Sequence, residues 1–294
     1  MKIVSNHSKK TAPIFRPDYR PKRAIVVPCY NEEQRLDSGA FISFIDASPD
    51  TLFVFVNDGS ADDTLLTLLG IQAKRPLNVV VADLDQNSGK AEAVRQGMIA
   101  AIELGAETVG YWDADLATPL DAIDDFTRIL DQYSDTQVVF GSRRMLLGHR
   151  IQRNFARRFV SRMCAALARQ AVRLPIGDTQ CGAKMFRTSS SLNAALERPF
   201  LAGWLFDVEL FSRLSSSMSG NRYAFFELTL SEWSEVPGSK INASTVIRSG
   251  WRMLVLIAEL RLHMSFQAKS RPSRVPGVTI KFARVANSET KIAA

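Results

Sequence analysis

Residues 108–115 read TVGYWDAD, an apolar run that ends in two aspartates. If residues 108–112 form a strand, alternate side chains point to the same face, so Asp113 and Asp115 project to one side. Carboxylate oxygens are hard ligands that suit Mg²⁺ or Mn²⁺, with a phosphate group completing the coordination. The stretch therefore predicts a strand that presents a metal- and phosphate-binding pair, although an isolated pair of this kind is also common in turns.

Two other strand-like runs also end in polar clusters. Residues 24–27 lead into PCYNE at 28–32, and residues 52–56 lead into NDGS at 57–60. In an open α/β sheet, ligands bind at the carboxyl ends of the strands. Taken alone, residues 57–60 also fit a simple turn followed by an N-cap. Three polar clusters at three strand ends nevertheless predict a single binding site where these ends meet.

Strand and helix patterns alternate along the chain, which is typical of a doubly wound, largely parallel sheet. The first half predicts strands at 24–28, 52–57, 78–81, 108–112 and 137–140, with helices near 32–46, 62–74 and 90–104. The second half predicts strands at 183–186 and 223–230, with helices over 150–173, 204–217 and 244–266. We expect one domain over residues 23–266, made of the halves 23–142 and 143–266, between flexible tails at 1–22 and 267–294.

Composition sets broad limits on the class of protein. The 294 residues are 46% hydrophobic and 23% charged, which is ordinary for a folded chain. Cys29, Cys164 and Cys181 lack the spacing of a zinc site or a disulfide framework and fit a reducing compartment. The sequence shows no signal peptide or membrane-spanning run, so we expect a cytoplasmic protein that is soluble or lies on a membrane surface.

Basic residues are concentrated between residues 143 and 173. This segment carries nine arginines, and residues 136–177 contain no acidic residue. An apolar stripe at steps of four predicts an amphipathic basic helix. A solvated helix face is the simpler interpretation, but the density of one charge favours a polyanionic partner or an anionic membrane. Nucleic acid is not the expected partner, because the chain has no recognisable nucleic-acid module.

Eight short segments carry a family resemblance. They are VPCYNE (27–32), NDGS (57–60), NSGK (87–90), DAD (113–115), GSR (141–143), DTQCG (178–182), FDVE (206–209) and WSEVPGSK (233–240). In this order they resemble the inverting GT-A glycosyltransferases of family 2, in the branch of dolichyl-phosphate glucosyltransferases and polyprenyl-phosphate sugar transferases. The resemblance implies an α/β GT-A fold: a doubly wound, mostly parallel sheet with a short antiparallel portion in the C-terminal half, and amphipathic helices.

The same resemblance implies a nucleoside-diphosphate sugar as donor and Mg²⁺ or Mn²⁺ as cofactor. Residues 23–142 would bind the nucleotide sugar, and residues 143–266 the acceptor. Ala117 stands where many mannosyl-transferring relatives carry glutamine, which favours UDP-glucose. The implied nucleotide-sugar residues are Pro28, Tyr30, Asn31, Glu32, Asp58, Lys90, Asp113, Ala114 and Asp115, with Asp113 and Asp115 as the metal ligands.

The acceptor decides which residues must activate it. A sugar hydroxyl, as in cell-envelope or exopolysaccharide synthesis, needs a base, and Asp207 or Asp178 is the candidate catalytic residue. Each of these also fits a helix N-cap or a buried salt bridge. A polyprenyl or dolichyl phosphate is already an anion and needs cations instead. The candidate cations are Arg143, Arg153, Arg157 and Lys240.

The arginine-rich segment favours a lipid-phosphate acceptor over a sugar hydroxyl. Such an acceptor implies peripheral contact with the cytoplasmic face of a membrane. The sequence leaves the oligomeric state open.

Overall fold

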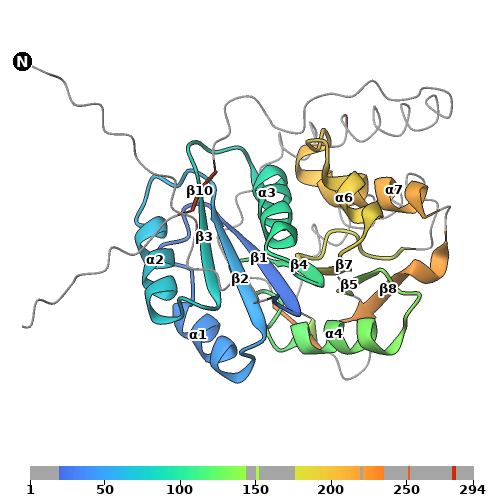
Figure 1. The fold of residues 1–294 in the computed structure, drawn as a ribbon, viewed down its shortest axis with the longest axis horizontal. Coiled ribbons are helices and arrows are strands. Elements are labelled where there is room, and N and C mark those ends of the chain that lie inside the picture. Colours follow the sequence, from blue (N-terminus) through green and yellow to red (C-terminus); the bar gives the residue numbers. More distant parts are fainter. Residues whose placement is uncertain are drawn as a thin grey trace, which may run out of the picture.

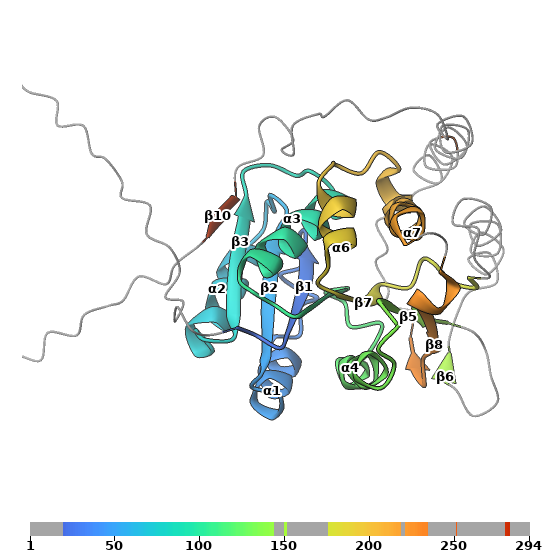
Figure 2. The same cartoon turned by 45° about the vertical axis from the view of Figure 1, so that its right-hand side comes forward.

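The structure is a computed structural model that describes residues 20–143, 176–218 and 221–234, with the short pieces 150–151, 251 and 280–282. A twisted sheet runs through its middle, and helices cover both faces (Figures 1 and 2). The strands are β1 (Arg23–Cys29), β2 (Thr51–Asn57), β3 (Val79–Leu84), β4 (Thr108–Trp112), β5 (Val138–Ser142), β6 (Arg150–Ile151), β7 (Ala183–Arg187), β8 (Phe225–Thr229), β9 (Glu232–Trp233) and β10 (Ile280–Phe282). The α-helices are α1 (Ser38–Ala47), α2 (Thr64–Lys74), α3 (Lys90–Glu103), α4 (Ala122–Gln132), α6 (Ser190–Leu196) and α7 (Phe206–Ser217), and short 3₁₀ turns are η1 (Gly203–Leu205) and η2 (Arg222–Ala224).

The main sheet has the strand order β10-β3-β2-β1-β4-β7-β5-β8. Strands β3, β2, β1 and β4 are parallel, so their carboxyl ends meet at one edge. Strand β7 pairs antiparallel with both β4 and β5, and β8 returns parallel to β5. The predicted doubly wound, mostly parallel sheet with an antiparallel portion in the C-terminal half is confirmed.

The core has two layers because the central strands are buried on both faces. On one face, Val26 and Val54 pack with residues of α3, α6 and α7. On the other face, Ile25 and Phe53 pack with residues of α1, α2 and α4. Phe41 of α1 meets Phe53 edge to face, with the ring centroids 5.5 Å apart. The helices are therefore fixed to the sheet by alternate residues of the same strands, which leaves the loops at the strand ends to carry the site.

Four details differ from the sequence prediction. Helix α1 begins at Ser38 rather than near residue 32, because Asp37 Oδ1 accepts a hydrogen bond from Ala40 N and caps it there. Helix α6 was not predicted. The helix expected over 150–173 is wrong at its start, where residues 150–151 form β6 and pair with β9. Residues 280–282 of the expected flexible C-terminal tail pair with β3 instead.

Several predictions fall on residues that the structure does not describe. They are the basic helix over residues 152–173, most of the last helix over 244–266, and most of both tails. Among the described helices, none has the length and apolar character needed to cross a membrane.

Candidate active site

The two aspartates of the DAD segment sit on a tight turn at the carboxyl end of β4. Asp113 N donates to Gly182 O at 3.1 Å, and Ala117 N donates to Asp115 Oδ1 at 3.1 Å. Between them, Leu116 adopts a left-handed backbone with φ 53°, a conformation that costs energy for a branched side chain and recurs at functional sites. Both carboxylates remain open to solvent, at 32% exposed for Asp113 and 26% for Asp115. The side chain of Ala114 is buried in the core, so only its main chain can face a ligand.

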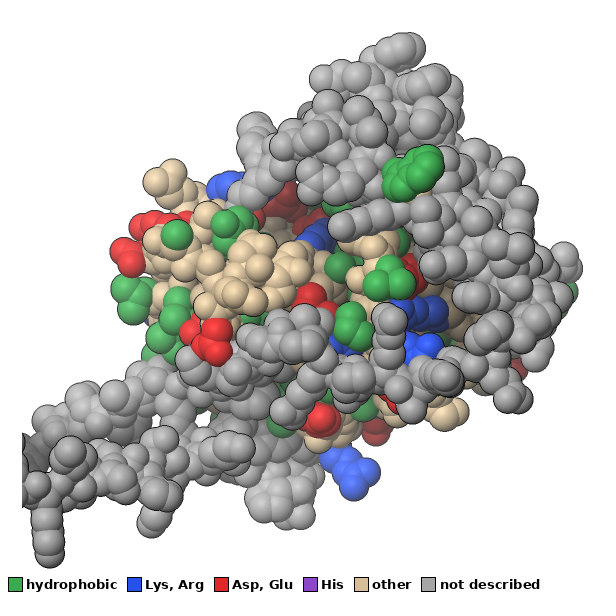
Figure 3. Space-filling view, turned by 90° about the horizontal axis from the view of Figure 1, so that it is seen from above, with side chains coloured by type: hydrophobic (Ala, Val, Ile, Leu, Met, Phe, Trp, Pro, Cys, Tyr) green, Lys and Arg blue, Asp and Glu red, His purple; other side chains and the backbone are tan. Residues whose placement is uncertain are grey.

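Each aspartate of the pair contacts a cation from a different segment of the chain. Lys90, at the start of α3, forms an ion pair with Asp113 Oδ1. Arg35, in the loop before α1, places Nη2 3.2 Å from Asp115 Oδ2. Partial burial and the neighbouring charge of Asp113 raise the pKa of Asp115. Figure 3 shows the molecule from above the view of Figure 1, on the side where the chain passes from β3 to α3. Acidic and basic side chains lie together near the middle of this face.

Gly182 makes room for the first aspartate. It lies in the segment before β7, directly under the side chain of Asp113. A Cβ atom at this position would be 1.9 Å from Asp113 Oδ2, which is far inside van der Waals contact. The segment DTQCG is part of the family resemblance, but only the pairing of β7 with β4 brings Gly182 into contact with Asp113.

Asp58 ties together the loops that follow β2 and β3. Its two carboxylate oxygens accept hydrogen bonds from Ser88 N at 2.7 Å and Gly89 N at 2.9 Å. Burial raises the pKa of Asp58 to about 6, against the lowering effect of these two hydrogen bonds. Gly59 allows the close approach, since a Cβ there would lie 2.5 Å from Asn87 N. Asp58 therefore positions the loop that carries Lys90.

The loop after β1 is fixed to the loop after β2 by hydrogen bonds. Asn31, with φ 50°, donates from its backbone to Ser60 Oγ at 3.0 Å and accepts from Ala61 N at 2.9 Å. Glu32 N donates to Thr64 Oγ1 at 2.8 Å. The ring of Tyr30 stays exposed, and Pro28 is half-buried. The expected nucleotide residues thus lie on adjoining, pre-ordered loops along the carboxyl edge.

Asp178 is held by Arg143 in a two-point ion pair. Arg143 Nε and Nη2 donate to the two carboxylate oxygens at 2.7 and 2.8 Å, and Asp178 is 5% exposed. The guanidinium of Arg143 also lies over the ring of Trp233, 5.4 Å from its centroid. Although burial opposes its charge, the adjacent carboxylate of Asp178 raises the pKa of Arg143.

Asp207 is likewise bound inside the protein. The hydroxyl of Tyr111 donates to Asp207 Oδ1, and Lys184 Nζ lies 3.0 Å from the same oxygen. Lys184 is fully buried on β7, and Asp207 is 6% exposed. Asp178 and Asp207 were each considered as a base, an N-cap or a partner in a buried salt bridge, and the structure shows both in buried salt bridges.

The fold brings residues from both halves of the chain to one place. Lys90 is an example. Burial opposes the charge of its ammonium group, but the nearby carboxylates of Asp113, Asp207 and Asp115 favour the charge and raise the pKa of Lys90. Arg153, Arg157 and Lys240 lie outside the described residues. Sequence reasoning missed Arg35, Gly182 and Lys184. Only Arg35 left a local signal, as a cation three residues after Glu32.

The donor set fits a small hard cation better than a structural metal centre. Within the part of the chain that the structure describes, no group of three or more His, Cys, Asp or Glu side chains gathers to hold an ion. Two adjacent, solvent-accessible carboxylates leave several positions for phosphate oxygens and water, the arrangement that Mg²⁺ and Mn²⁺ accept.

Comparisons with known proteins identify the family of the chain. The family described as Glycosyl transferase family 2 matches residues 24–192. The dolichyl-phosphate beta-glucosyltransferase of Drosophila melanogaster is 31% identical, over 74% of this chain and 69% of that protein. The human protein of the same name is 30% identical, over 79% of this chain and 74% of that protein.

A solved structure shows the same architecture. Glucosyl-3-phosphoglycerate synthase from Mycobacterium tuberculosis, crystallised with Mn²⁺, uridine diphosphate and glucosyl-3-phosphoglycerate, matches with a TM-score of 0.58 at 16% identity, over 81% of this chain and 80% of that chain. The likeness is one of fold, and it confirms the GT-A fold. Since the family match spans more than half of the residues, the chain belongs to glycosyl transferase family 2 and is a glycosyltransferase.

Proposed function

We propose that this protein transfers glucose from UDP-glucose to a polyprenyl or dolichyl phosphate, with Mg²⁺ or Mn²⁺ as cofactor. The observation that carries the proposal is the open Asp113–Asp115 pair beside Lys90 and the Asp58 loop, in a chain about 30% identical to dolichyl-phosphate beta-glucosyltransferases. The structural neighbour that holds Mn²⁺ and uridine diphosphate supports the choice of metal and nucleotide.

The nucleotide-sugar donor would bind at the carboxyl edge of the sheet. Asp113 and Asp115 would hold the cation, which when bound neutralises negative charge on the departing diphosphate. Lys90 lies beside the same carboxylates, so its ammonium is placed to meet a phosphate oxygen. The exposed ring of Tyr30 offers an apolar face to the nucleotide base.

The acceptor end favours a group that is already an anion. Both carboxylates considered as a base are engaged, Asp178 by Arg143 and Asp207 by Lys184 and Tyr111. A phosphate needs no proton removed at neutral pH, so these pairs can remain intact during transfer. The arginine-rich segment supports peripheral contact with the anionic cytoplasmic face of a membrane, where such an acceptor resides.

A transfer assay with radiolabelled UDP-glucose tests this function. We expect product with a short-chain polyprenyl phosphate and Mn²⁺, none with the unphosphorylated polyprenol, and none with chelator. Asp115→Asn should reduce kcat at least ~10²-fold, the scale of one lost transition-state contact. Asp121→Asn, at an exposed carboxylate before α4, serves as the matched control and should keep full activity.

Two results would count against the proposal. Transfer to a sugar hydroxyl, with none to the lipid phosphate, would establish the alternative acceptor. Absence of binding to anionic vesicles in a flotation experiment would remove the membrane contact.

A further inference from the structure

Arg35 joins the nucleotide side of the site to the aspartate pair. It lies between β1 and α1, and its side chain is 25% exposed. Nη2 is 3.2 Å from Asp115 Oδ2, and Nε is 3.6 Å from Glu32 Oε2. One guanidinium therefore spans an expected nucleotide residue and an expected metal ligand.

Both oxygens of Asp115 are engaged within the protein. Oδ1 accepts the hydrogen bond from Ala117 N, and Oδ2 faces Arg35. A dication that takes Oδ2 must displace the guanidinium or lie beside it. Two positive charges a few ångströms apart repel strongly in a partly buried site. The cost falls when further negative charge enters, as it does with a nucleotide diphosphate.

We propose that Arg35 competes with the divalent cation for Asp115, and thereby makes tight metal binding depend on the nucleotide diphosphate. This inference rests on the proposed function. Before the diphosphate binds, Arg35 keeps Asp115 paired. When the diphosphate binds, its oxygens offer the guanidinium an alternative partner and give the cation further ligands. Metal and nucleotide then bind cooperatively, and each raises the affinity of the other by the same factor.

Mn²⁺ binding measured by electron paramagnetic resonance of the free ion tests the competition directly. The wild-type chain, Arg35→Met and Arg35→Lys are titrated with and without uridine diphosphate, and the binding of Mn²⁺ to free nucleotide is subtracted. We expect Arg35→Met to bind Mn²⁺ alone about 10-fold tighter than wild type, with the gain from nucleotide reduced by a similar factor, within the usual range of coupling between two sites. Arg35→Lys keeps the positive charge and should stay near wild type.

Arg75→Met is the matched control. Arg75 pairs with Asp46 on the surface, away from the carboxyl edge, and both side chains are substantially exposed. It should leave Mn²⁺ affinity and the nucleotide effect unchanged. A melting curve of each variant shows that the titrated protein is folded.

The outcomes separate the two proposals. Equal or weaker Mn²⁺ affinity in folded Arg35→Met, with nucleotide-dependent binding intact in wild type, overturns the competition and leaves the proposed function standing. If Arg35→Met does not fold, Arg35→Lys serves in its place. A gain in Mn²⁺ affinity on adding uridine diphosphate that differs between Arg35→Lys and wild type then overturns the competition. Failure of wild type to bind Mn²⁺ even with the nucleotide overturns both.

Discussion

The Asp113 and Asp115 ion pairs at the carboxyl edge of the sheet and the Arg23 contacts at its amino edge differ in how closely the protein encloses them. At the carboxyl edge, Asp113 and Asp115 are about a quarter to a third exposed, and their partners are Lys90 at the start of α3 and Arg35 in the loop before α1. Water and a ligand reach these carboxylates, so the pairs can be exchanged for other partners.

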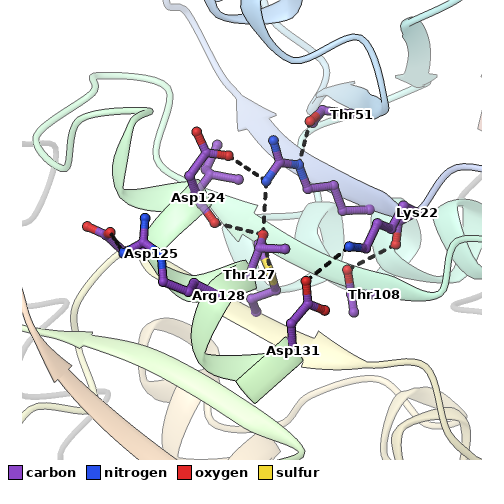
Figure 4. A network of polar contacts seen from close by, with 11 residues as sticks. Lys22, Thr51, Thr108, Asp124, Asp125, Thr127, Arg128 and Asp131 are labelled. Carbon is purple, nitrogen blue, oxygen red and sulfur yellow. Dashed lines mark hydrogen bonds and ion pairs between the residues drawn. The ribbon is translucent and has the colours of Figure 1, made fainter. Parts of the chain in front are cut away.

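At the amino edge, Arg23 at the start of β1 is enclosed. Its guanidinium donates to Thr51 Oγ1 at 2.6 Å and to Thr127 Oγ1 at 3.0 Å, and it lies 2.6 Å from Asp124 (Figure 4). The side chain of Arg23 is 11% exposed, so these contacts hold β1, β2 and α4 together. The comparison of Arg23 with the Asp113 and Asp115 pairs shows that opposite charges alone do not mark a binding site, because the same kind of contact is open to a ligand in one place and enclosed in the other.

Gly182→Ala should give the largest effect, a loss of glucosyl transfer caused by a change at the carboxyl edge. The new methyl group would occupy the place of the Asp113 carboxylate, which must swing away. We expect glucosyl transfer to fall about 10²-fold, as for a catalytic group misplaced by an ångström. Thermal stability should change little, because the displaced atoms are the end of a flexible side chain.

Gly70→Ala is the control for that substitution. Gly70 lies within α2 with open space around its Cα, so alanine should raise stability by about 0.5–1 kcal/mol and leave transfer unchanged. Full activity in Gly182→Ala would contradict the role given to this contact.

Asp58→Asn tests the comparison further, because Asp58 is buried although it lies at the same edge as the more exposed Asp113 and Asp115. The folded-state pKa of about 6 lies above the ordinary value of 3.8, so the folded protein binds more protons in this range. The stabilising contribution of the Asp58 carboxyl is fully present below pH 3.8 and is lost as pH rises through about 6.

The measurement for Asp58 is a pair of melting series from pH 4 to pH 8. At the acid end, the protonated carboxyl can still accept from both N–H groups, whereas the NH₂ group of asparagine leaves one of these buried donors unsatisfied, at a cost of about 1–3 kcal/mol. The difference from wild type should shrink up to about pH 6 and then stay constant. A difference that grows over this interval would contradict the raised pKa.

Arg23→Met, at the amino edge, should lower stability and leave transfer unchanged, which is the reverse of the effect expected for Gly182→Ala. Removing the guanidinium leaves the hydroxyls of Thr51 and Thr127 short of a donor, at a cost of about 1–2 kcal/mol in the free energy of unfolding. The kcat at saturating substrate should match wild type. Chemical denaturation and the transfer assay together check both statements, and a large loss of kcat without loss of stability would erase the distinction between the edges.

Lys22→Met should have the smallest effect. Lys22 pairs with Asp131 at 3.0 Å beside Arg23, but the two side chains are 55% and 53% exposed. A surface pair of this kind contributes less than about 1 kcal/mol, and salt screens it. Denaturation at low and high ionic strength measures it, and an effect as large as that of Arg23→Met would show that burial is not what separates the two.

The sequence predicted the elements whose signals are local. Strand β4 was predicted with its exact bounds at 108–112, and the first four strands were all found, because apolar runs followed by polar clusters need no distant information. The start of α1 and the two-residue strand β6 were not, since the first depends on a cap at Asp37 and the second on pairing with residues more than eighty positions away.

The candidate site shows the same division. Asp113, Asp115, Lys90 and Asp58 were identified from motifs, and the fold gathers them at one edge. Their partners were not identified, because a side chain that reaches across loops leaves no periodic trace. Asp178 and Asp207 are examples, since only the structure shows that Arg143 and Lys184 lie beside them.

The sequence by itself determined the alternation of strands and helices, and the two carboxylates that project from the end of β4, since both follow from spacing along one segment. Only the tertiary structure decided that β7 enters antiparallel between β4 and β5, bringing Gly182 under Asp113 and Lys184 to Asp207. Contacts between residues far apart in the chain depend on strand pairing and packing, which no local pattern of residues specifies.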